Sequence, residues 1–443
     1  MNIKNHKNHS TPKFVLSRLQ KESIIAGSGI ALEYYSVFLF GYTSFIILPF
    51  FFRSPVALVN GWISILEAIM GVIGAIICGH VGDTLGRKKI LVYTIAFVAL
   101  PPFLISILPG YDHIGIIATA AFIIFRLIQM FAFGGDMIGL VTFILEDDSA
   151  TKQRGKLGGY MSMCAGIGAA IASLNLYLVD PFSDPTSFWK WRLILIFGVI
   201  GMLVANYLKK TLGKSDRFSH YQKEHHKRSL PPLVDVMLNN KLSLLRVLGI
   251  TPLVPVITLT IFAWILKFSV EHLHLPVNHA MGLNCGALLL FVIGAPIFGA
   301  LSDKYGRKLI LCGVSAFLFL FSYPLFQCLG HTESKLQFFF IQAIFAFASS
   351  AYYGVAMTTC IEQVPTHIRY TGVAVGYYIN YAFLAGMSGE YLEKLSIDIS
   401  QKIFSLLELH SIPSPVLYLM AAALIVFISS FSSKEKAGQV LSD

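Results

Sequence analysis

Gly79-His-Val-Gly-Asp-Thr-Leu-Gly-Arg-Lys-Lys89 is a basic, glycine-rich stretch between two long apolar runs. Half a chain later, a related stretch, Gly299-Ala-Leu-Ser-Asp-Lys-Tyr-Gly-Arg-Lys308, stands between two further apolar runs. The shared positions pair Asp83 with Asp303, Gly86 with Gly306 and Arg87 with Arg307. Two copies of one motif at this spacing indicate two related halves. In a membrane protein, such a repeat is typical of transporters.

The composition indicates a membrane protein. Of the 443 residues, 55% are hydrophobic and only 13% are charged, whereas about 25% charged residues are usual in a soluble chain. Apolar runs of about 20 residues, each long enough to cross a bilayer as a helix, recur along the chain. The six cysteines lack the spacing of metal ligands, so we expect small apolar residues, with neither a disulfide nor a metal site.

We predict an all-α membrane protein with twelve transmembrane helices in two six-helix bundles. The predicted spans are 24–51, 61–79, 90–108, 114–145, 156–178, 191–207, 243–268, 281–301, 309–328, 337–361, 371–392 and 413–431. The predicted parts are an N-terminal tail (1–22), a first bundle (23–207), a linker (208–241), a second bundle (242–431) and a C-terminal tail (432–443).

Positive charge predicts the orientation of the bundles. Lys and Arg, 34 in all, are concentrated in the tails, the linker and the loops that follow even-numbered spans. Cytoplasmic loops of membrane proteins collect these residues, which explains the net charge of +10 without nucleic acid. We therefore expect both termini in the cytoplasm of a cell whose inner (plasma) membrane holds the chain.

The two glycine-rich stretches are expected to form tight turns and to supply a cytoplasmic gate. Glycine permits a sharp reversal, Asp83 suits the positive N-terminus of a helix, and Arg87 is within reach of Glu146 or Asp147 at the end of span four. The second half offers matching residues. The expected gate residues are Gly79, Asp83, Gly86, Arg87, Glu146, Asp303, Gly306, Arg307 and Glu362.

Further motifs support a family resemblance. They are Leu32-Glu-Tyr-Tyr-Ser-Val-Phe-Leu-Phe-Gly41 in span one, Arg126-Leu-Ile-Gln-Met-Phe-Ala-Phe-Gly-Gly-Asp136 in span four, Lys152-Gln-Arg-Gly155 after it, Trp189-Lys-Trp-Arg192 before span six and Pro365-Thr-His-Ile-Arg-Tyr-Thr-Gly372 before span eleven. With the repeated stretch, this set resembles the major facilitator superfamily, in particular its metabolite:proton symporters, which include proline/betaine and α-ketoglutarate transporters. The resemblance covers residues 25–430 and implies a central cavity with alternating access.

Several residues depart from the family pattern. Ser36 stands where the family has an aspartate, which is a protonation site in related proton-coupled transporters. Lys267 is new, Tyr378 stands where an asparagine is usual, and Glu390 follows a glycine at a usual proline position. The substrates of the family therefore do not transfer directly to this chain.

Charged residues inside membrane spans usually face the bundle interior and have a partner. We expect Glu33 and Arg126 to pair and to couple proton movement, with a static salt bridge as the alternative. Asp136 is either a second proton site or an acid that packs helices. Lys267 and Glu390 either reach the cavity or extend to the membrane interface, which is the preferred interpretation.

Aromatic and polar residues complete the predicted binding site. Aromatic faces suit an ammonium group, although tyrosines also pack between helices or at the membrane interface. The expected substrate-binding residues are Tyr34, Tyr35, Ser36, Gln129, Lys267, Tyr353, Tyr377, Tyr378 and Asn380, with Tyr352 and Tyr381 as further aromatic candidates. Arginine and lysine favour a carboxylate and the tyrosines an amine, so a zwitterion satisfies both.

The functional prediction is secondary active transport, with proton symport of a small polar metabolite. An uncoupled facilitator or an exporter is the alternative, and a membrane sensor that binds without transporting is a weaker one. An enzyme is not expected, because the sequence contains neither a nucleophile–base set nor a phosphate-binding loop. We expect no cofactor, no metal and no nucleic acid. The expected partners are the small-molecule substrate, protons and the lipid bilayer, and the chain is expected to be a monomer.

Overall fold

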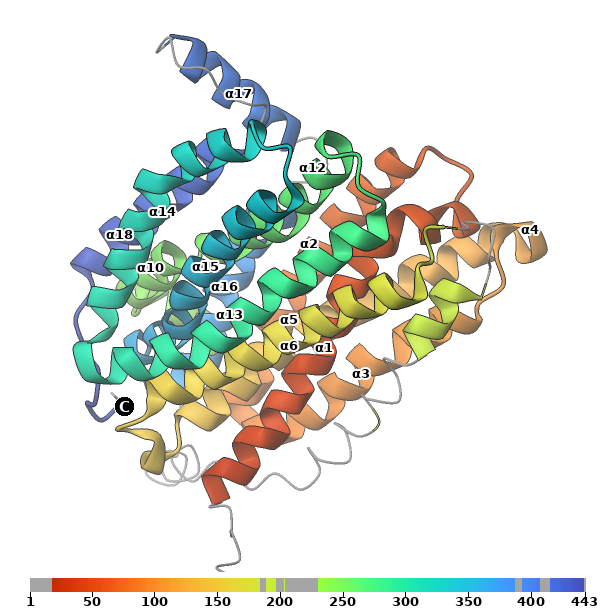
Figure 1. Cartoon of the computed structure of the whole chain (residues 1–443). Helices are drawn as coiled ribbons and strands as arrows, with labels where there is room; N and C mark the ends of the chain where they lie inside the picture. The colour runs from red at the N-terminus through yellow and green to blue at the C-terminus, as the bar shows by residue number, and fades with distance from the viewer. Residues whose placement is uncertain are drawn as a thin grey trace, which may run out of the picture.

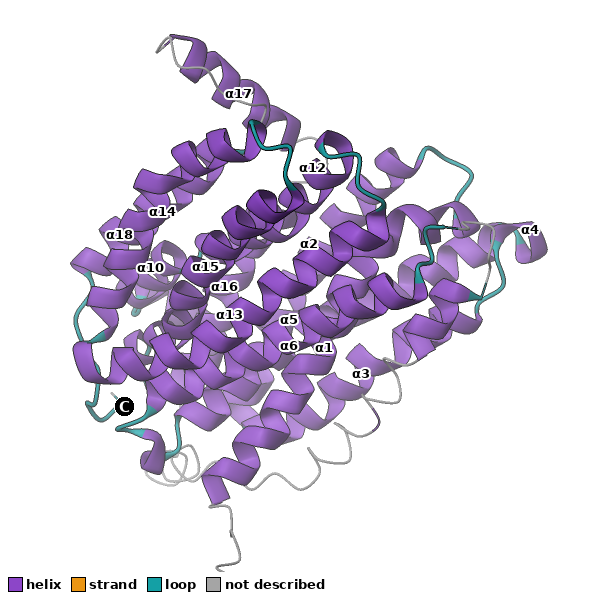
Figure 2. Cartoon of the chain, viewed as in Figure 1, coloured by secondary structure: helices purple, strands orange, loops and turns teal. Residues whose placement is uncertain are grey.

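The computed structural model describes residues 18–183, 189–196, 203, 230–386, 393–406 and 415–441, and within these ranges the regular structure is helical throughout (Figure 2). The first half contains α1 (Arg18–Phe51), α2 (Val56–Leu85), α3 (Arg87–Ile107), the short α4 (Tyr111–Ile114), α5 (Ile116–Leu145) and α6 (Arg154–Val179). Residues 191–196 begin the predicted sixth span, and most of that span and the linker up to residue 229 lie outside the described residues.

The second half repeats this pattern after a short helix, α9 (Pro232–Leu238). Its long helices are α13 (Val277–Tyr305), α14 (Arg307–Gly330), α15 (Lys335–Gln363), α16 (Arg369–Tyr381) and α18 (Val416–Ser432). The seventh span, predicted as one helix, is divided into α10 (Lys241–Ile250), α11 (Leu253–Ile257), a π-helical segment η2 (Thr258–Trp264) and α12 (Ile265–His272). A second π-helical segment, η4 (Ala382–Gly386), continues α16.

Among the described residues, eight helices are long and apolar enough to cross a membrane, and α18 and part of α3 are shorter apolar helices. Their backbone polar groups are paired within each helix, which is the requirement for a segment in lipid. One further helix, α17 (Glu393–Leu406), had not been predicted, and it projects beyond the bundle at the end opposite the chain's C-terminus (Figure 1).

The glycine-rich stretches differ from the expected turns. Helix α2 continues through most of the first stretch to Leu85, and α13 continues likewise to Tyr305. Only Gly86 and Gly306 reverse the chain, with φ of 99° and 94°. A positive φ of this kind strains any residue with a Cβ atom, which explains why glycine stands at each turn. We call the end of the molecule that carries these two glycines the loop end.

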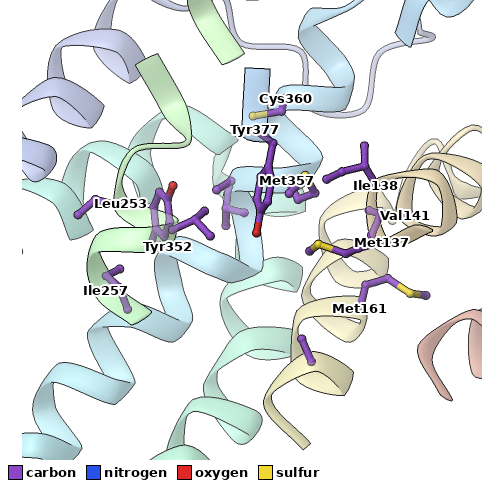
Figure 3. Close-up of a cluster of buried hydrophobic side chains, with 14 of the residues drawn as sticks. Met137, Ile138, Val141, Met161, Leu253, Ile257, Tyr352, Met357, Cys360 and Tyr377 are labelled. Carbon is purple, nitrogen blue, oxygen red and sulfur yellow. The ribbon is translucent and has the colours of Figure 1, made fainter. Parts of the chain in front are cut away.

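The two halves meet along two helix pairs, α6 with α13 and α2 with α16 (Figure 1). Small residues allow the first pair to approach closely, as in other membrane helix contacts. A Cβ atom on Gly299 would lie 2.3 Å from the carbonyl oxygen of Gly155. Between the halves, apolar side chains of α5 and α6 meet those of α11, α15 and α16 (Figure 3). The labelled members of this cluster are Met137, Ile138, Val141, Met161, Leu253, Ile257, Tyr352, Met357, Cys360 and Tyr377.

Candidate functional site

The first ion cluster lies at the loop end and consists of Asp83, Arg87, Glu146 and Arg369. Arg87 forms an ion pair with Glu146, as expected, and a longer one with Asp83, at 3.5 Å between Nη2 and Oδ1. Arg369 supplies a second guanidinium, whose Nη1 lies 2.6 Å from Oε1 of Glu146. Because these side chains are fully buried, their charges interact in a medium of low dielectric constant, where pairing is strong.

Asp83 connects this cluster to the other half of the molecule. Its carboxylate accepts hydrogen bonds from the backbone N–H and the hydroxyl of Thr371, each at 2.8 Å, and from the N–H of Tyr370. These donors belong to the first turn of α16, whose unpaired N–H groups and positive dipole favour a carboxylate. Helix α2 of the first half therefore holds the start of α16 of the second.

The second ion cluster consists of Asp303, Arg307, Glu362 and Arg154, and it repeats the arrangement across the other helix pair. Arg307 lies 3.1 Å from Glu362 and 2.9 Å from Asp303. Asp303 accepts 2.8 Å hydrogen bonds from the N–H groups of Gly155 and Lys156, in the first turn of α6. Arg154 and Arg369 were not among the predicted gate residues, although both stand in the motifs just after the loops that follow α5 and α15.

The C-terminal tail lies against the second ion cluster. The Glu435 carboxylate accepts a 3.0 Å hydrogen bond from the N–H of Lys308, and Lys436 Nζ donates to the carbonyl of Glu362 at 2.9 Å. Arg154 Nη1 donates to the carbonyl of Gln439 at 2.7 Å. Arg154 belongs to the first half and Lys308 to the second, so the tail bridges the two.

Inside the membrane region, Arg126 of α5 pairs with Glu67 of α2, which was not among the predicted site residues. Its Nε lies 2.7 Å from Oε1 of Glu67 on α2, whereas the expected partner was Glu33. Arg126 Nη1 also donates to the Gln129 side chain at 2.6 Å, and Gln129 donates to Ser36 at 3.2 Å. The signal in the sequence was an acid, Glu67, within the apolar run of span two.

Glu33 and Asp136 are both buried on the helices where they were expected. Glu33 is 1% exposed on α1, and its backbone carbonyl accepts a hydrogen bond from Ser36. Asp136 accepts a 2.6 Å hydrogen bond from the Thr94 hydroxyl on α3. This bond joins α3 to α5, so it favours the helix-packing interpretation of Asp136.

The tyrosines gather where α1, α15 and α16 meet, and most of their hydroxyl groups are engaged within the protein. Tyr353 donates to the carbonyl of Val254 and Tyr378 to that of Phe133, each at 2.7 Å. Tyr34 contacts the Met137 sulfur at 3.5 Å. The Tyr377 ring lies 5.1 Å from that of Tyr378 and stacks on that of Tyr381. These contacts support packing, while the clustered ring faces keep the chemistry required for an ammonium group.

Three expected binding residues lie elsewhere. Tyr35 donates to the carbonyl of Ile194, at the start of the sixth span. Asn380 donates to Leu248 and to Thr251 beside α10, so its amide joins helices. Lys267 is exposed on α12, which agrees with an extension to the interface, and its role in binding stays a prediction. Glu390 lies outside the described residues.

Two related halves of membrane-spanning helices, with ion clusters at one end and a largely buried charge pair inside, define a multi-pass transporter. The Major Facilitator Superfamily profile matches residues 31–390, and the chain belongs to this family. It is therefore a transporter rather than an enzyme, and a multi-pass inner-membrane protein.

Three individual proteins illustrate the similarity. The glycine betaine/proline/ectoine/pipecolic acid transporter of Dickeya dadantii is 24% identical over 438 residues, covering 96% of this chain and 85% of the relative. The citrate-proton symporter of Salmonella typhi is 25% identical over 373 residues, covering 82% and 84%. A structure of a proton:xylose symporter has a TM-score of 0.76 at 13% identity, covering 96% of this chain and 98% of that one.

Proposed function

We propose that this transporter is a proton-coupled symporter for a small polar metabolite, a zwitterion or a carboxylate. The observation that carries the proposal is the largely buried pair of Arg126 with Glu67 inside the membrane region. A charge near the bilayer centre costs at least about 2.5–3.5 kcal/mol, so such residues are kept mainly for function. Relatives whose names include a citrate-proton symporter support the same function.

The proposed substrate site lies around Arg126 and the tyrosine cluster. A guanidinium can bind a carboxylate through two parallel hydrogen bonds, and Tyr34, Tyr377 and Tyr381 offer aromatic faces to an amine. Tyr381 lies near both Glu67 and Arg126, which connects the tyrosines with the charge pair. A zwitterion would use both features, whereas a simple carboxylate would need Arg126 alone.

The proposed transport cycle is alternating access between two bundles, 23–207 and 242–431, in a monomer. In this proposal the loop end and both termini face the cytoplasm, because Lys and Arg are concentrated in these segments. The two ion clusters hold the cytoplasmic side closed, and they separate when the bundles rock to release the substrate inside.

The experiment is uptake into proteoliposomes under an imposed pH gradient. The external medium contains a defined mixture of amino acids, betaines and mono- to tricarboxylates, and mass spectrometry identifies the internal solutes. We expect at least one solute to accumulate when the outside is more acidic, and a protonophore to abolish the accumulation. Accumulation that resists the protonophore, or none of any solute, would contradict proton symport. Equilibration without accumulation would support the uncoupled facilitator.

A further inference from the structure

We infer that Glu67, rather than Glu33, carries the coupled proton. This inference rests on the proposed function and assigns its central residue. Glu67 is the carboxylate paired with Arg126, at 2.7 Å between Oε1 and Nε. An adjacent guanidinium stabilises the charged form of a carboxylate, and its removal favours the protonated form in a poorly solvated site. Any ligand that draws Arg126 away therefore makes Glu67 a proton acceptor.

Access also distinguishes the two acids. The side chain of Glu67 is 13% exposed, whereas Glu33 is only 1% exposed. A proton carrier must exchange protons with water on one side of the membrane and then on the other. Glu67 is thus the more accessible of the two acids, while Glu33 is buried in α1.

The position of Glu67 on α2 connects its charge to the contact between the halves. It begins a stripe along α2 that continues through Gly71, Gly79 and Gly82, and all three glycines face α16. A Cβ atom on these glycines would lie 3.2 Å from Tyr378, 2.8 Å from Thr371 and 2.3 Å from Tyr370, respectively. A change of charge at Glu67 thus occurs on the face along which the halves must separate.

Several helices that pack against α2 carry charged or titratable groups that bear on Glu67. From α5 it faces Arg126, and Tyr381 of α16 lies nearby. Helix α1 carries the buried Glu33 near its middle and Arg18, Lys21 and Glu22 in its first turns, and Ser36 of α1 reaches Arg126 through Gln129. Asp235 of α9, which also packs against α2, forms an ion pair with His367. The described cations of α3 stand in its first turn, at the loop end. Arg126 is therefore the cation that decides the charge of Glu67.

The coupled steps balance without any additional reactant. A solute carboxylate accepts the guanidinium hydrogen bonds of Arg126, and Glu67 then binds a proton from the outer solution. After the halves rock, the solute leaves, Arg126 returns to Glu67, and the proton departs to the inner solution. One proton and one solute thus cross together, and no covalent bond other than O–H is made or broken.

The test uses the solute that the wild-type protein accumulates from the mixture described above. Glu67→Gln mimics the permanently protonated acid, so we expect loss of pH-driven accumulation while exchange of labelled for unlabelled solute continues. Solute added to unbuffered wild-type protein in detergent should also cause proton uptake, and this signal should vanish in the variant. Glu33→Gln is the matched comparison and should retain both signals.

Each outcome has a defined meaning. Wild-type protein without pH-driven accumulation would overturn the proposed function itself. Wild-type accumulation that persists in Glu67→Gln, or that is lost only in Glu33→Gln, would overturn this inference alone. If Glu67→Gln does not fold, Glu67→Asp decides, because a shorter carboxylate must shift the pH profile of uptake if it carries the proton. An unchanged profile would overturn the inference.

Discussion

The two ion clusters repeat one design with different degrees of enclosure. In the first cluster Asp83, Arg87 and Glu146 are fully buried, and Arg369 adds a second guanidinium to Glu146. In the second cluster the Asp303 side chain is 14% exposed. The side chain of Arg154 makes its described hydrogen bonds with Leu145, Thr151 and the tail residue Gln439.

This difference indicates how each cluster joins the two halves at the loop end. Removal of one partner from a fully buried ion pair leaves a charge that water cannot reach, whereas a partly exposed charge is resolvated. The first cluster therefore depends on its own ion pairs, and the second obtains part of its stability from the C-terminal tail. The following predictions compare the two, from the largest expected effect to the smallest.

Arg87→Ala should have the largest effect. It leaves the Glu146 and Asp83 carboxylates buried with less compensation, so we expect a loss of about 3–5 kcal/mol from the closed state. The measurement is thermal unfolding of purified protein together with the accessibility of a cysteine placed at the loop end. Arg87→Lys is the control and should be intermediate, because lysine keeps the charge but not the planar donor geometry. The prediction would be contradicted if Arg87→Ala had the same unfolding temperature and the same cysteine accessibility as the wild-type protein.

Arg307→Ala should cost less than Arg87→Ala. Its partner Glu362 is buried but keeps Arg154 nearby, and its other partner Asp303 is partly exposed and keeps two backbone hydrogen bonds from α6. We therefore expect about 1–3 kcal/mol. The same two measurements apply, and the order of the two variants is the critical result. Equal effects, or a larger effect for Arg307→Ala, would show that burial does not distinguish the clusters.

A chain that ends at Ser433 tests the contribution of the tail. The truncation removes the carboxylate of Glu435, the ammonium of Lys436 and the carbonyl of Gln439, which contact Lys308, Glu362 and Arg154. We expect about 1–2 kcal/mol less stability for the closed state. Combined with Arg307→Ala, the truncation should act less than additively, because both changes weaken one cluster. Full additivity would argue that the tail acts independently of that cluster.

Acidic pH should have the smallest effect, through Glu435. Partial burial alone would raise the pKa of this carboxyl, but hydrogen bonds from the N–H groups of Lys308 and Ala437 outweigh it and lower the pKa. A lowered pKa in the docked tail means that its stabilisation is complete above the ordinary value of about 4.3 and is lost as the pH falls through the docked value.

Proteolysis of the tail between pH 7 and 3 measures this effect. We expect the wild-type tail to be cleaved faster at the acidic end, because docking of the tail becomes weaker by about 0.3–1 kcal/mol. Glu435→Gln should remove this part of the pH dependence. A variant with the same pH profile as the wild type would assign the titration to another group.

The sequence predicted the ion clusters well because each carries its own local signal. The repeated Asp, Gly and Arg positions identified the two loops, and Glu146 and Glu362 were the acids at the ends of the preceding spans. The helical course of Gly79 to Leu85 was not predicted, because glycines that allow close helix contact and glycines that allow turns look alike in a sequence. Among the glycines of the first stretch, Gly86 alone has the positive φ of a turn.

The intramembrane pair was predicted less well, for a physical reason. Residues on the same face of one helix can be recognised from their spacing, but which helices meet depends on the packing of the whole bundle. Glu33 was chosen because it stands one turn before Ser36, whereas the structure brings α2 and Glu67 to Arg126. Similarly, the exposure of Lys267 and the bonding of Asn380 to Leu248 depend on neighbours that the sequence does not specify.

The most direct test of the account is a distance across the loop end. Spin labels at the exposed positions Lys152, in the first half, and Lys304, in the second, would report the separation of the halves by pulsed electron resonance. The account predicts mainly one short distance in the wild-type protein and an additional longer distance in Arg87→Ala. The same short distance in both proteins would contradict the conclusion that the ion clusters hold the two halves together.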